Sequence, residues 1–282
     1  MKKSKTKLPK VVIVGAGKVG AALHAAAKAA GGSSTLYAAR KFKPKTKLDC
    51  DLLILAVRDK EFAPLAEAIA NAGTLSKKAV AVHVAGALTA DAIAPLRSAC
   101  AGVAQMHPMI SFASPKKPPR LTNGNVHVRG DRAAETRARA FAKAIGMTPR
   151  TFPKLDPVGY HAAAAFVANG AAALAAIGQK VLEGAGVPAK EAQKMLGPLL
   201  GSVADNVSAL GFPAALTGPI RRGDPNSVGK QLALLRARQP DAVPLFVTAG
   251  LAQIPLARAL GEAPTEGFDA IVEILTKAGK EI

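Results

Sequence analysis

The sequence contains no tryptophan, and aromatic residues make up only 4% of its 282 residues. A core of this composition must be built from Ala, Val and Leu. There are only two cysteines, Cys50 and Cys100. Two cysteines exclude a disulfide framework, and we expect both to pack as small apolar side chains in a reducing compartment. The spacings typical of metal sites, such as CxxC, HExxH or an Asp-rich loop, are also missing, so no metal site is expected.

Acidic residues are scarce: 19 Asp and Glu stand against 38 Lys and Arg, which gives a net charge of +19. Such a chain attracts anions over a Debye length, about 8 Å at physiological salt. The basic residues are spread along the chain and no aromatic platform alternates with them, so specific nucleic-acid binding is not expected. Residues 1–9 form a basic tail, which lacks the apolar core of a secretory signal.

A long membrane-type hydrophobic run is also missing. His161 to Gly178 contains no Asp, Glu, Lys or Arg, but it is mostly Ala and is interrupted by Asn169 and glycines. It lacks the Leu and Ile content that membrane insertion favours. We interpret it as a buried helix of a soluble bundle and expect a cytoplasmic protein without a membrane partner.

The first half alternates strand-like and helix-like segments. Thr89 and Asp131 are candidate N-caps, because a side-chain oxygen at that position can accept a hydrogen bond from an unpaired backbone N–H. The alternation predicts an α/β fold, with a Rossmann-like, mostly parallel sheet covered by helices on both faces. The expected strands are 11–14, 35–39, 52–57, 80–84, 103–106 and 126–128. The expected helices are a stretch that ends at Ala30, the segment 61–72, one from Thr89 toward Ala99 and one from Asp131 to Gly146.

The second half contains no convincing strand after about Asp156. Helical patterns cover about 157–184, 188–209, 225–238, 241–260 and 265–279. We therefore predict an α/β domain over 10–153 and an all-helical C-terminal domain over 154–282.

A glycine motif follows the first predicted strand. Gly15-Ala16-Gly17-Lys18-Val19-Gly20 matches G-x-G-x-x-G at the start of a helix, the context of a dinucleotide-binding loop. Gly15 would allow the tight turn, Gly17 the approach of the pyrophosphate and Gly20 the packing of helix on strand. The helix N-terminus offers free N–H groups to phosphate. The alternative is a glycine turn with a purely structural role.

Basic residues occupy the positions that distinguish an NAD site from an NADP site. An NAD site would carry an Asp or Glu about 20 residues after the motif. This chain has Arg40 and Lys41 there, which suit a 2′-phosphate, so we expect NADP, with NADPH preferred over NADH. The alternative is that these are ordinary surface cations.

Three further predicted strands end at positions suited to ligand contact, since ligands bind at the carboxyl ends of strands in open α/β sheets. Val57, His83 and Gly86 are assigned to the cofactor site on this ground. His107 follows the next strand and is a candidate catalytic residue. His24 and His127 are interpreted as structural.

The first helix of the second half carries Tyr160-His161 and, two turns later, Asn169. A proton donor and an amide that orients a substrate would be useful beside a nicotinamide. A polar pair at a helix interface is the alternative. Further along, Leu216-Thr-Gly-Pro-Ile-Arg-Arg-Gly-Asp224 places Arg222 where it could bind a substrate carboxylate, while Asp224 also fits a helix N-cap.

Taken in order, these motifs resemble those of a known group. Gly15 to Gly20, His83-x-x-Gly86, His107-Pro108, Tyr160-His161 with Asn169, and Leu216 to Asp224 look like the bacterial Rossmann-like proteins with a C-terminal helical domain of uncharacterised function. That group is similar to pyrroline-5-carboxylate reductases, ketopantoate reductases and β-hydroxyacid dehydrogenases.

The resemblance implies a nicotinamide cofactor on the first domain and a homodimer formed through the second. One departure affects the mechanism: β-hydroxyacid dehydrogenases and ketopantoate reductases place a catalytic Lys four residues before an Asn. If Asn169 is that Asn, Ala165 stands at the Lys position. His161 is then the better candidate for proton donor, with His107 as the other.

The sequence thus predicts an NADPH-dependent reductase of a small C=O or C=N substrate that carries a carboxylate. Asn169 would orient the substrate and Arg222 would bind its anionic group. The alternative is a nucleotide-sensing or nucleic-acid-associated protein that uses the fold without catalysis, which the net charge favours.

Overall fold

A computed structural model describes residues 8–281 of the chain, in two compact units: one up to Ala168 and one from Asn169 onward. The predicted division at 153/154 lies just before a helix that runs through both units, and it stays a prediction. The predicted basic tail falls almost entirely outside the described residues.

The first unit is built on a seven-stranded sheet with the order β2-β1-β3-β4-β5-β6-β7. Neighbouring strands are parallel, except that β6 runs antiparallel to β5. The central strands are continuous apolar runs that are buried throughout, as expected for strands covered on both faces. The strands are β1 (Val11–Val14), β2 (Ser34–Tyr37), β3 (Leu52–Leu55), β4 (Val80–His83), β5 (Val103–Pro108), β6 (Asn125–Gly130) and β7 (Thr148–Arg150).

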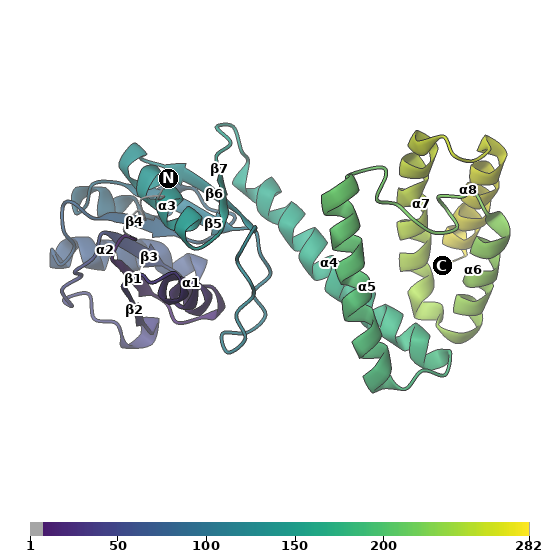
Figure 1. Cartoon of the computed structure of the whole chain (residues 1–282), viewed down its shortest axis with the longest axis horizontal. Helices are drawn as coiled ribbons and strands as arrows, with labels where there is room; N and C mark the ends of the chain where they lie inside the picture. Colours follow the sequence, from purple (N-terminus) through teal and green to yellow (C-terminus); the bar gives the residue numbers. More distant parts are fainter. Residues whose placement is uncertain (1–7, 282) are drawn as a thin grey trace, which may run out of the picture. The chain divides into compact units, whose positions relative to one another are not determined.

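Helices cover both faces of this sheet (Figure 1). One core cluster joins α1 (Lys18–Ala29) and α3 (Arg132–Ala144) to the sheet. A second cluster on the opposite face joins α2 (Phe62–Ala72) and the 3-10 segment η3 (Ala90–Ser98). Two short 3-10 turns, η1 (Ala39–Lys41) and η2 (Asp59–Glu61), follow β2 and precede α2. The predicted α/β class is confirmed.

Three local expectations need correction. Strand β7 was not predicted, because its three residues include Pro149, which weakens any strand pattern. Neither Thr89 nor Asp131 caps its helix through the side chain. Asp131 instead accepts a hydrogen bond from the Val103 backbone N–H at 2.9 Å and pairs with Arg97.

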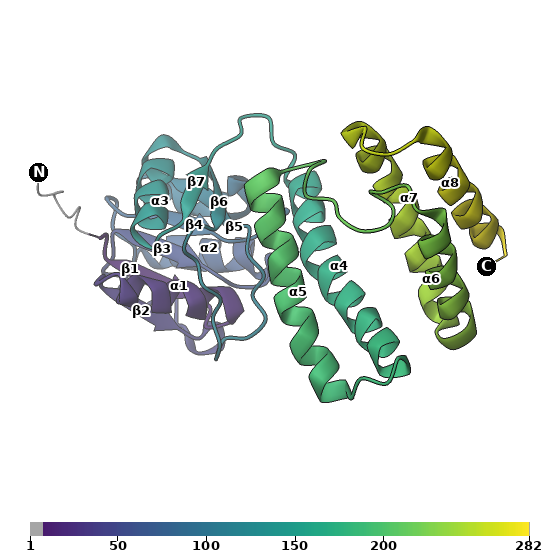
Figure 2. The ribbon, with the colours of Figure 1, turned by 45° about the vertical axis from the view of Figure 1, so that its right-hand side comes forward.

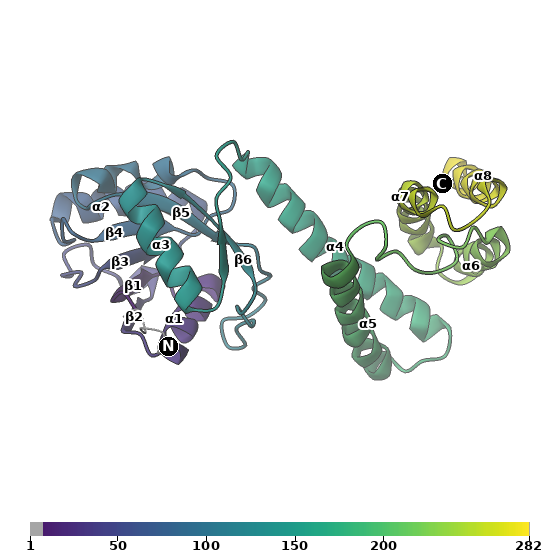
Figure 3. The same ribbon diagram turned by 45° about the horizontal axis from the view of Figure 1, so that its top comes forward.

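The C-terminal part is helical, as predicted. Helix α4 (Pro157–Gly184) runs through the division between the units, and α5 (Ala189–Leu210) folds back after a short turn (Figure 2). Helices α6 (Pro225–Arg238), α7 (Val243–Leu260) and α8 (Thr265–Lys280) form a compact group (Figure 3), with η4 (Pro240–Ala242) before α7. Their shared core includes Val228, Val247, Phe268, Ile271 and Leu275.

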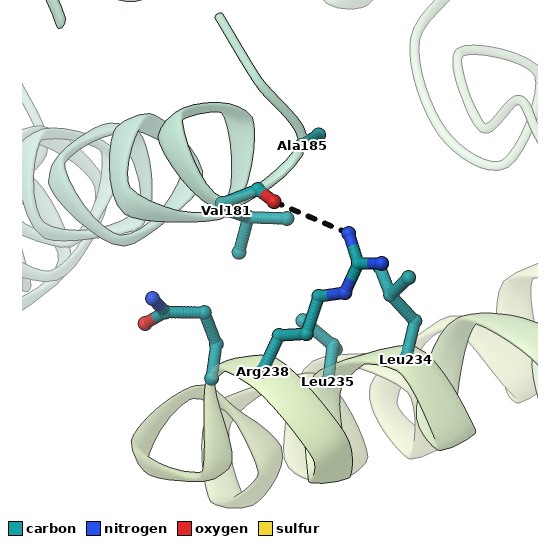
Figure 4. A pocket seen from close by; sticks show the side chains of 7 residues that line it. Val181, Ala185, Leu234, Leu235 and Arg238 are labelled. Atoms are coloured by element: carbon teal, nitrogen blue, oxygen red, sulfur yellow. Dashed lines mark hydrogen bonds between the residues drawn. The ribbon is translucent and has the colours of Figure 1, made fainter.

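Helix α4 joins this group at its C-terminal end. Arg238 donates a hydrogen bond from Nη1 to the Gly184 carbonyl at 3.2 Å, beside the apolar side chains of Val181, Leu234 and Leu235 (Figure 4). The crevice left between these residues holds about 10 Å³, room for no more than one water molecule. This contact therefore serves packing.

The expectation of a buried helix over 161–178 is wrong for the single chain, because no residue of α4 is buried. By length and composition, α4 and the segment Pro240–Leu260 could each cross a membrane. Two such helices are weak support for a membrane span, since core helices of soluble proteins meet the same criterion.

Candidate active site

The glycine loop lies between β1 and α1, next to the point where the strand order reverses. Parallel neighbours β2 and β3 flank β1, and ligands bind at such switch points in open α/β sheets. Gly15 has φ 120°, and a Cβ on it would lie 2.2 Å from the Ala56 carbonyl oxygen. A Cβ on Gly20 would lie 1.9 Å from the Gly15 oxygen. The backbone packing at these two positions therefore requires glycine.

Gly17 differs, because no atom lies within 4 Å of a Cβ added there. It is the N-cap of α1 and provides no capping side chain, and the first turn of α1 carries no acidic residue. The first N–H groups of the helix are thus left for an outside acceptor, as a pyrophosphate site requires. Ala16 and Lys18 are exposed beside them, while Val19 packs against the core.

The predicted 2′-phosphate residues occupy one short turn. Arg40 and Lys41 lie in η1, directly after β2, and both are exposed. Strand β2 pairs with β1, so this turn and the glycine loop share the carboxyl edge of the sheet. The placement suits a phosphate group attached to a nucleotide on the glycine loop.

His83 and Val57 are more enclosed than the sequence suggested. His83 is fully buried, its Nε2 lies 2.8 Å from the Thr89 carbonyl oxygen, and its Nδ1 accepts from the Ala85 N–H at 3.3 Å. Burial lowers the pKa of His83, so the ring is neutral at pH 7. Both nitrogens are used within the protein, which leaves no free polar atom for a cofactor. Val57 packs partly into the adjoining core.

His107, His161 and Gly86 come together at the same edge. The His107 and His161 rings meet edge to face with their centroids 5.6 Å apart. A Cβ on Gly86 would lie 2.3 Å from His161 Nδ1 and 2.9 Å from His107 Nε2. Both nitrogens therefore approach one spot above Gly86. Tyr160 lies beside His107, with the ring centroids 5.7 Å apart.

Sequence reasoning missed two residues of this cluster, Gln105 and His127. Register places His127 directly opposite His107 on antiparallel β6, and Gln105 lies one pleat earlier on β5. The Gln105 amide donates to the carbonyls of Ala85 at 2.9 Å and Gly86 at 3.1 Å. Its Oε1 lies 3.1 Å from His127 Nδ1. The sequence signal that could have identified them was a polar side chain inside an otherwise apolar strand.

These hydrogen bonds fix where the protons lie on two rings. His107 Nδ1 lies 2.9 Å from the Val84 carbonyl, which can only accept, so this nitrogen carries the proton. His127 Nδ1 likewise donates to Gln105 Oε1, because the amide nitrogen of Gln105 is already used. Burial lowers the pKa of both imidazoles, with a smaller contribution from neighbouring histidines. Both rings thus present Nε2 as a hydrogen-bond acceptor at neutral pH.

The remaining predicted site residues belong to the second unit. Asn169 lies on α4 two turns beyond His161 and is exposed. Arg222 is exposed, and its side chain makes no hydrogen bond or ion pair with any residue between 8 and 281. Its neighbour Arg221 pairs with Glu262 through two bonds of 2.8 and 2.7 Å, and Asp224 accepts from the Ser227 N–H at 3.0 Å as the N-cap of α6.

Part of the chain matches a known family model. Residues 125–253 match the model described as a domain of unknown function, DUF2520. No curated protein matches the sequence.

Several solved structures share the fold. A candidate NADP oxidoreductase from Bacteroides fragilis is 20% identical, with a TM-score of 0.67 over 88% of this chain and 98% of that protein. A pyrroline-5-carboxylate reductase from Coxiella burnetii is 13% identical, with a TM-score of 0.57 over 90% and 99%. An imine reductase from Myxococcus stipitatus, in complex with NADP+, is 15% identical, with a TM-score of 0.57 over 95% and 100%.

At these identities the likeness concerns the fold. It confirms the predicted resemblance to Rossmann-like oxidoreductases with a C-terminal helical domain. The individual site residues stay predictions.

Proposed function

We propose that this protein is an NADPH-dependent reductase that transfers hydride to a small C=N or C=O substrate carrying a carboxylate. The observation that carries the proposal is the approach of His107 Nε2 and His161 Nδ1 to one spot above Gly86. Strands β1, β3 and β4 are parallel, so Gly86 and the glycine loop lie at the same edge of one sheet. The fold shared with an imine reductase and a pyrroline-5-carboxylate reductase supports the same reaction class.

The cofactor residues fit a dinucleotide. Gly15 and Gly20 shape the loop, and Gly17 leaves open space in front of the uncapped N-terminus of α1. Arg40 and Lys41 would bind a 2′-phosphate through charge-assisted hydrogen bonds. The nicotinamide, when bound, supplies the hydride, while the protein supplies positioning and electrostatics.

The two histidines have different roles in this proposal. His107 presents an acceptor nitrogen, so it receives a hydrogen bond from the reacting group and does not supply a proton. His161 is exposed and is not held by a backbone carbonyl, so it is the proposed proton donor. His161 would supply the one proton to the imine nitrogen, and the resulting N–H could donate to His107 while the carbon receives the hydride, which favours C=N over C=O among the proposed substrates.

Asn169 and Arg222 complete the proposal as residues for substrate orientation and for the carboxylate. Arg222 is suited because its guanidinium has no partner among the described residues, whereas Arg221 is used within the helical unit. A cytoplasmic location is proposed on the fold shared with these reductases.

A fluorescence titration with NADPH and NADH at moderate salt is the first test. We expect NADPH to bind at least about tenfold more tightly, a difference of ~1.4 kcal/mol. Arg40→Glu combined with Lys41→Glu should remove that preference, while the control Lys116→Glu should keep it. If neither nucleotide binds, the glycine loop is structural and the reductase proposal fails. DNA binding that persists at moderate salt and falls steeply only at higher salt would favour the non-catalytic alternative.

With binding established, matched cyclic imine carboxylates and 2-keto acids identify the substrate. NADPH oxidation is followed by absorbance, and His161→Ala should lower kcat with little effect on NADPH affinity. Turnover that is intact in His161→Ala would refute its assignment as proton donor.

We also propose that the helical unit forms a homodimer. Apolar side chains on α4 and α5 are exposed in one chain, among them Leu174 at 48%, Met195 at 55% and Leu199 at 57%. Large apolar side chains that are exposed in this way on two neighbouring helices favour an interaction site there. Light scattering after size exclusion should give twice the chain mass. Leu199→Glu should shift it to the monomer, and Leu234→Glu on α6 should not.

A further inference from the structure

The first unit contains a cavity on the face of the sheet opposite α3. It has a volume of about 340 Å³. Side chains alternate between the two faces of β5 and β6, so Gln105, His127 and Arg129 point to this face, away from the α3 core. Thr89 and Asp91 at the start of η3 also line the cavity, together with the Phe152–Pro157 segment.

One wall of this cavity contains a buried acceptor without a donor. His127 is 3% exposed, and its Nδ1–H is used by Gln105. Its Nε2 is the one buried side-chain nitrogen or oxygen in residues 8–281 that has no hydrogen-bond partner. Buried polar atoms are almost always paired, so this nitrogen calls for an N–H or O–H group that the described chain does not provide.

The same cavity holds a cation without a partner. The Arg97 guanidinium forms ion pairs with the Asp91 carboxylate at 2.8 Å and the Asp131 carboxylate at 3.0 Å. The Arg129 side chain makes no hydrogen bond or ion pair with any residue that the structure describes, and its charge helps to lower the pKa of His127. Phe152 and Leu155 provide apolar surface beside these polar groups.

We propose that this cavity binds a small carboxylic acid that also carries a hydroxyl or amino group. The carboxylate would pair with Arg129, the O–H or N–H would donate to His127 Nε2, and the carbon skeleton would contact Phe152 and Leu155. This cavity lies on the face of the sheet, next to the proposed reductase site at its edge, and Gln105 and His127 border both. Gln105 connects the two, because it bonds both His127 and the Gly86 carbonyl.

The test uses the full chain and three matched probes: 3-phenyllactate, 3-phenylpropionate without the hydroxyl, and 3-phenyllactamide without the charge. Binding is measured by calorimetry, and the His127 ring nitrogens are followed by NMR. We expect 3-phenyllactate to bind at least tenfold more tightly than either analogue and to shift the Nε2 resonance toward that of a hydrogen-bonded nitrogen. Equal binding of the three probes, or no saturable binding, would overturn the proposal.

Two variants separate the contacts. Arg129→Gln should remove the preference for the acid over the amide, and Arg120→Gln, a surface arginine that does not line the cavity, should keep it. His127→Phe should remove the preference for the hydroxyl. Arg129 is exposed, so its variant tests the proposal even if His127→Phe fails to fold. Displacement of 3-phenyllactate by NADPH would place the acid at the cofactor site and overturn this proposal while leaving the reductase proposal intact.

Discussion

Gly86→Ala should disable the proposed active site while leaving the fold intact. Built on the backbone, the new methyl group would lie 2.3 Å from His161 Nδ1, 2.8 Å from His107 Cε1 and 2.9 Å from His107 Nε2. Nonbonded heavy atoms favour separations of about 3.5 Å, so the His161 nitrogen must move by about 1 Å. His107 is held by the Val84 carbonyl and cannot give way as easily.

The expected loss of catalytic rate follows from that displacement. A misplacement of about 1 Å in a catalytic group costs about 10²-fold in rate, equivalent to ~2.7 kcal/mol of transition-state stabilisation. The effect on stability is smaller, because His161 lies on an exposed turn of α4 and can rotate away. Gly86 does not have a positive φ, so Ala introduces no backbone strain, and the lower entropy of its unfolded chain contributes about 0.4–1 kcal/mol of stability.

The assay is NADPH-dependent turnover, with thermal unfolding measured alongside it. Gly229→Ala on α6 is the matched control, since no atom lies within 4 Å of its added methyl group, and it should keep full activity. We expect kcat to fall about 100-fold in Gly86→Ala with a small change in Tm. A kcat within threefold of the wild-type value, with unshifted His161 ring resonances, would refute the reasoning.

Three further predictions follow from single sites. Gly17→Ala should leave the unfolding midpoint unchanged, since nothing lies near its added methyl group, but weaken NADPH binding about tenfold or more; unchanged affinity in a titration would exclude a pyrophosphate at this loop. Arg221→Ala should lower Tm by several degrees through the loss of its bonds to Glu262 and two carbonyls, whereas Arg222→Ala should not; calorimetry showing equal effects would contradict this. The free energy of unfolding, measured in urea, should fall as the pH drops below about 6.5. Burial lowers the folded-state pKa of His83 and His107, so the unfolded chain binds more protons than the folded chain in this range. A urea midpoint that rises on acidification would contradict these shifts.

Much of the fold could be predicted because its signals are local. The β1 and β3 runs are apolar at every position, which is typical of strands buried on both faces. The helices after Asp156 end at Gly and Pro signals, and α6 matches its predicted range of 225–238. Asp224 caps that helix through its side chain. This cap could be predicted because an Asp directly before a Pro is a local signal for the start of a helix.

Other features were missed because they depend on residues far apart in the chain. Asp131 has the sequence position of an N-cap, yet its carboxylate bonds the Val103 backbone N–H of a neighbouring strand and Arg97. Helix α4 has the composition of a core helix, but whether its face is covered depends on which surface packs against it. In one chain these contacts are partial, as at Ile177 and Val181, and none of the α4 residues is buried.

For the candidate site, the glycine loop, the basic turn after β2 and the choice of His107 and His161 could all be predicted from the sequence. These follow from spacing, since a loop between a strand and a helix is a continuous segment. The contact of His161 with His107 above Gly86, and the position of His127 and Gln105 beside them, are visible only in the folded chain. Antiparallel pairing of β5 with β6 places His127 opposite His107, and the backbone carbonyls then fix the proton on each ring. Strand register and proton position both depend on partners distant in sequence, so no local pattern could have revealed them.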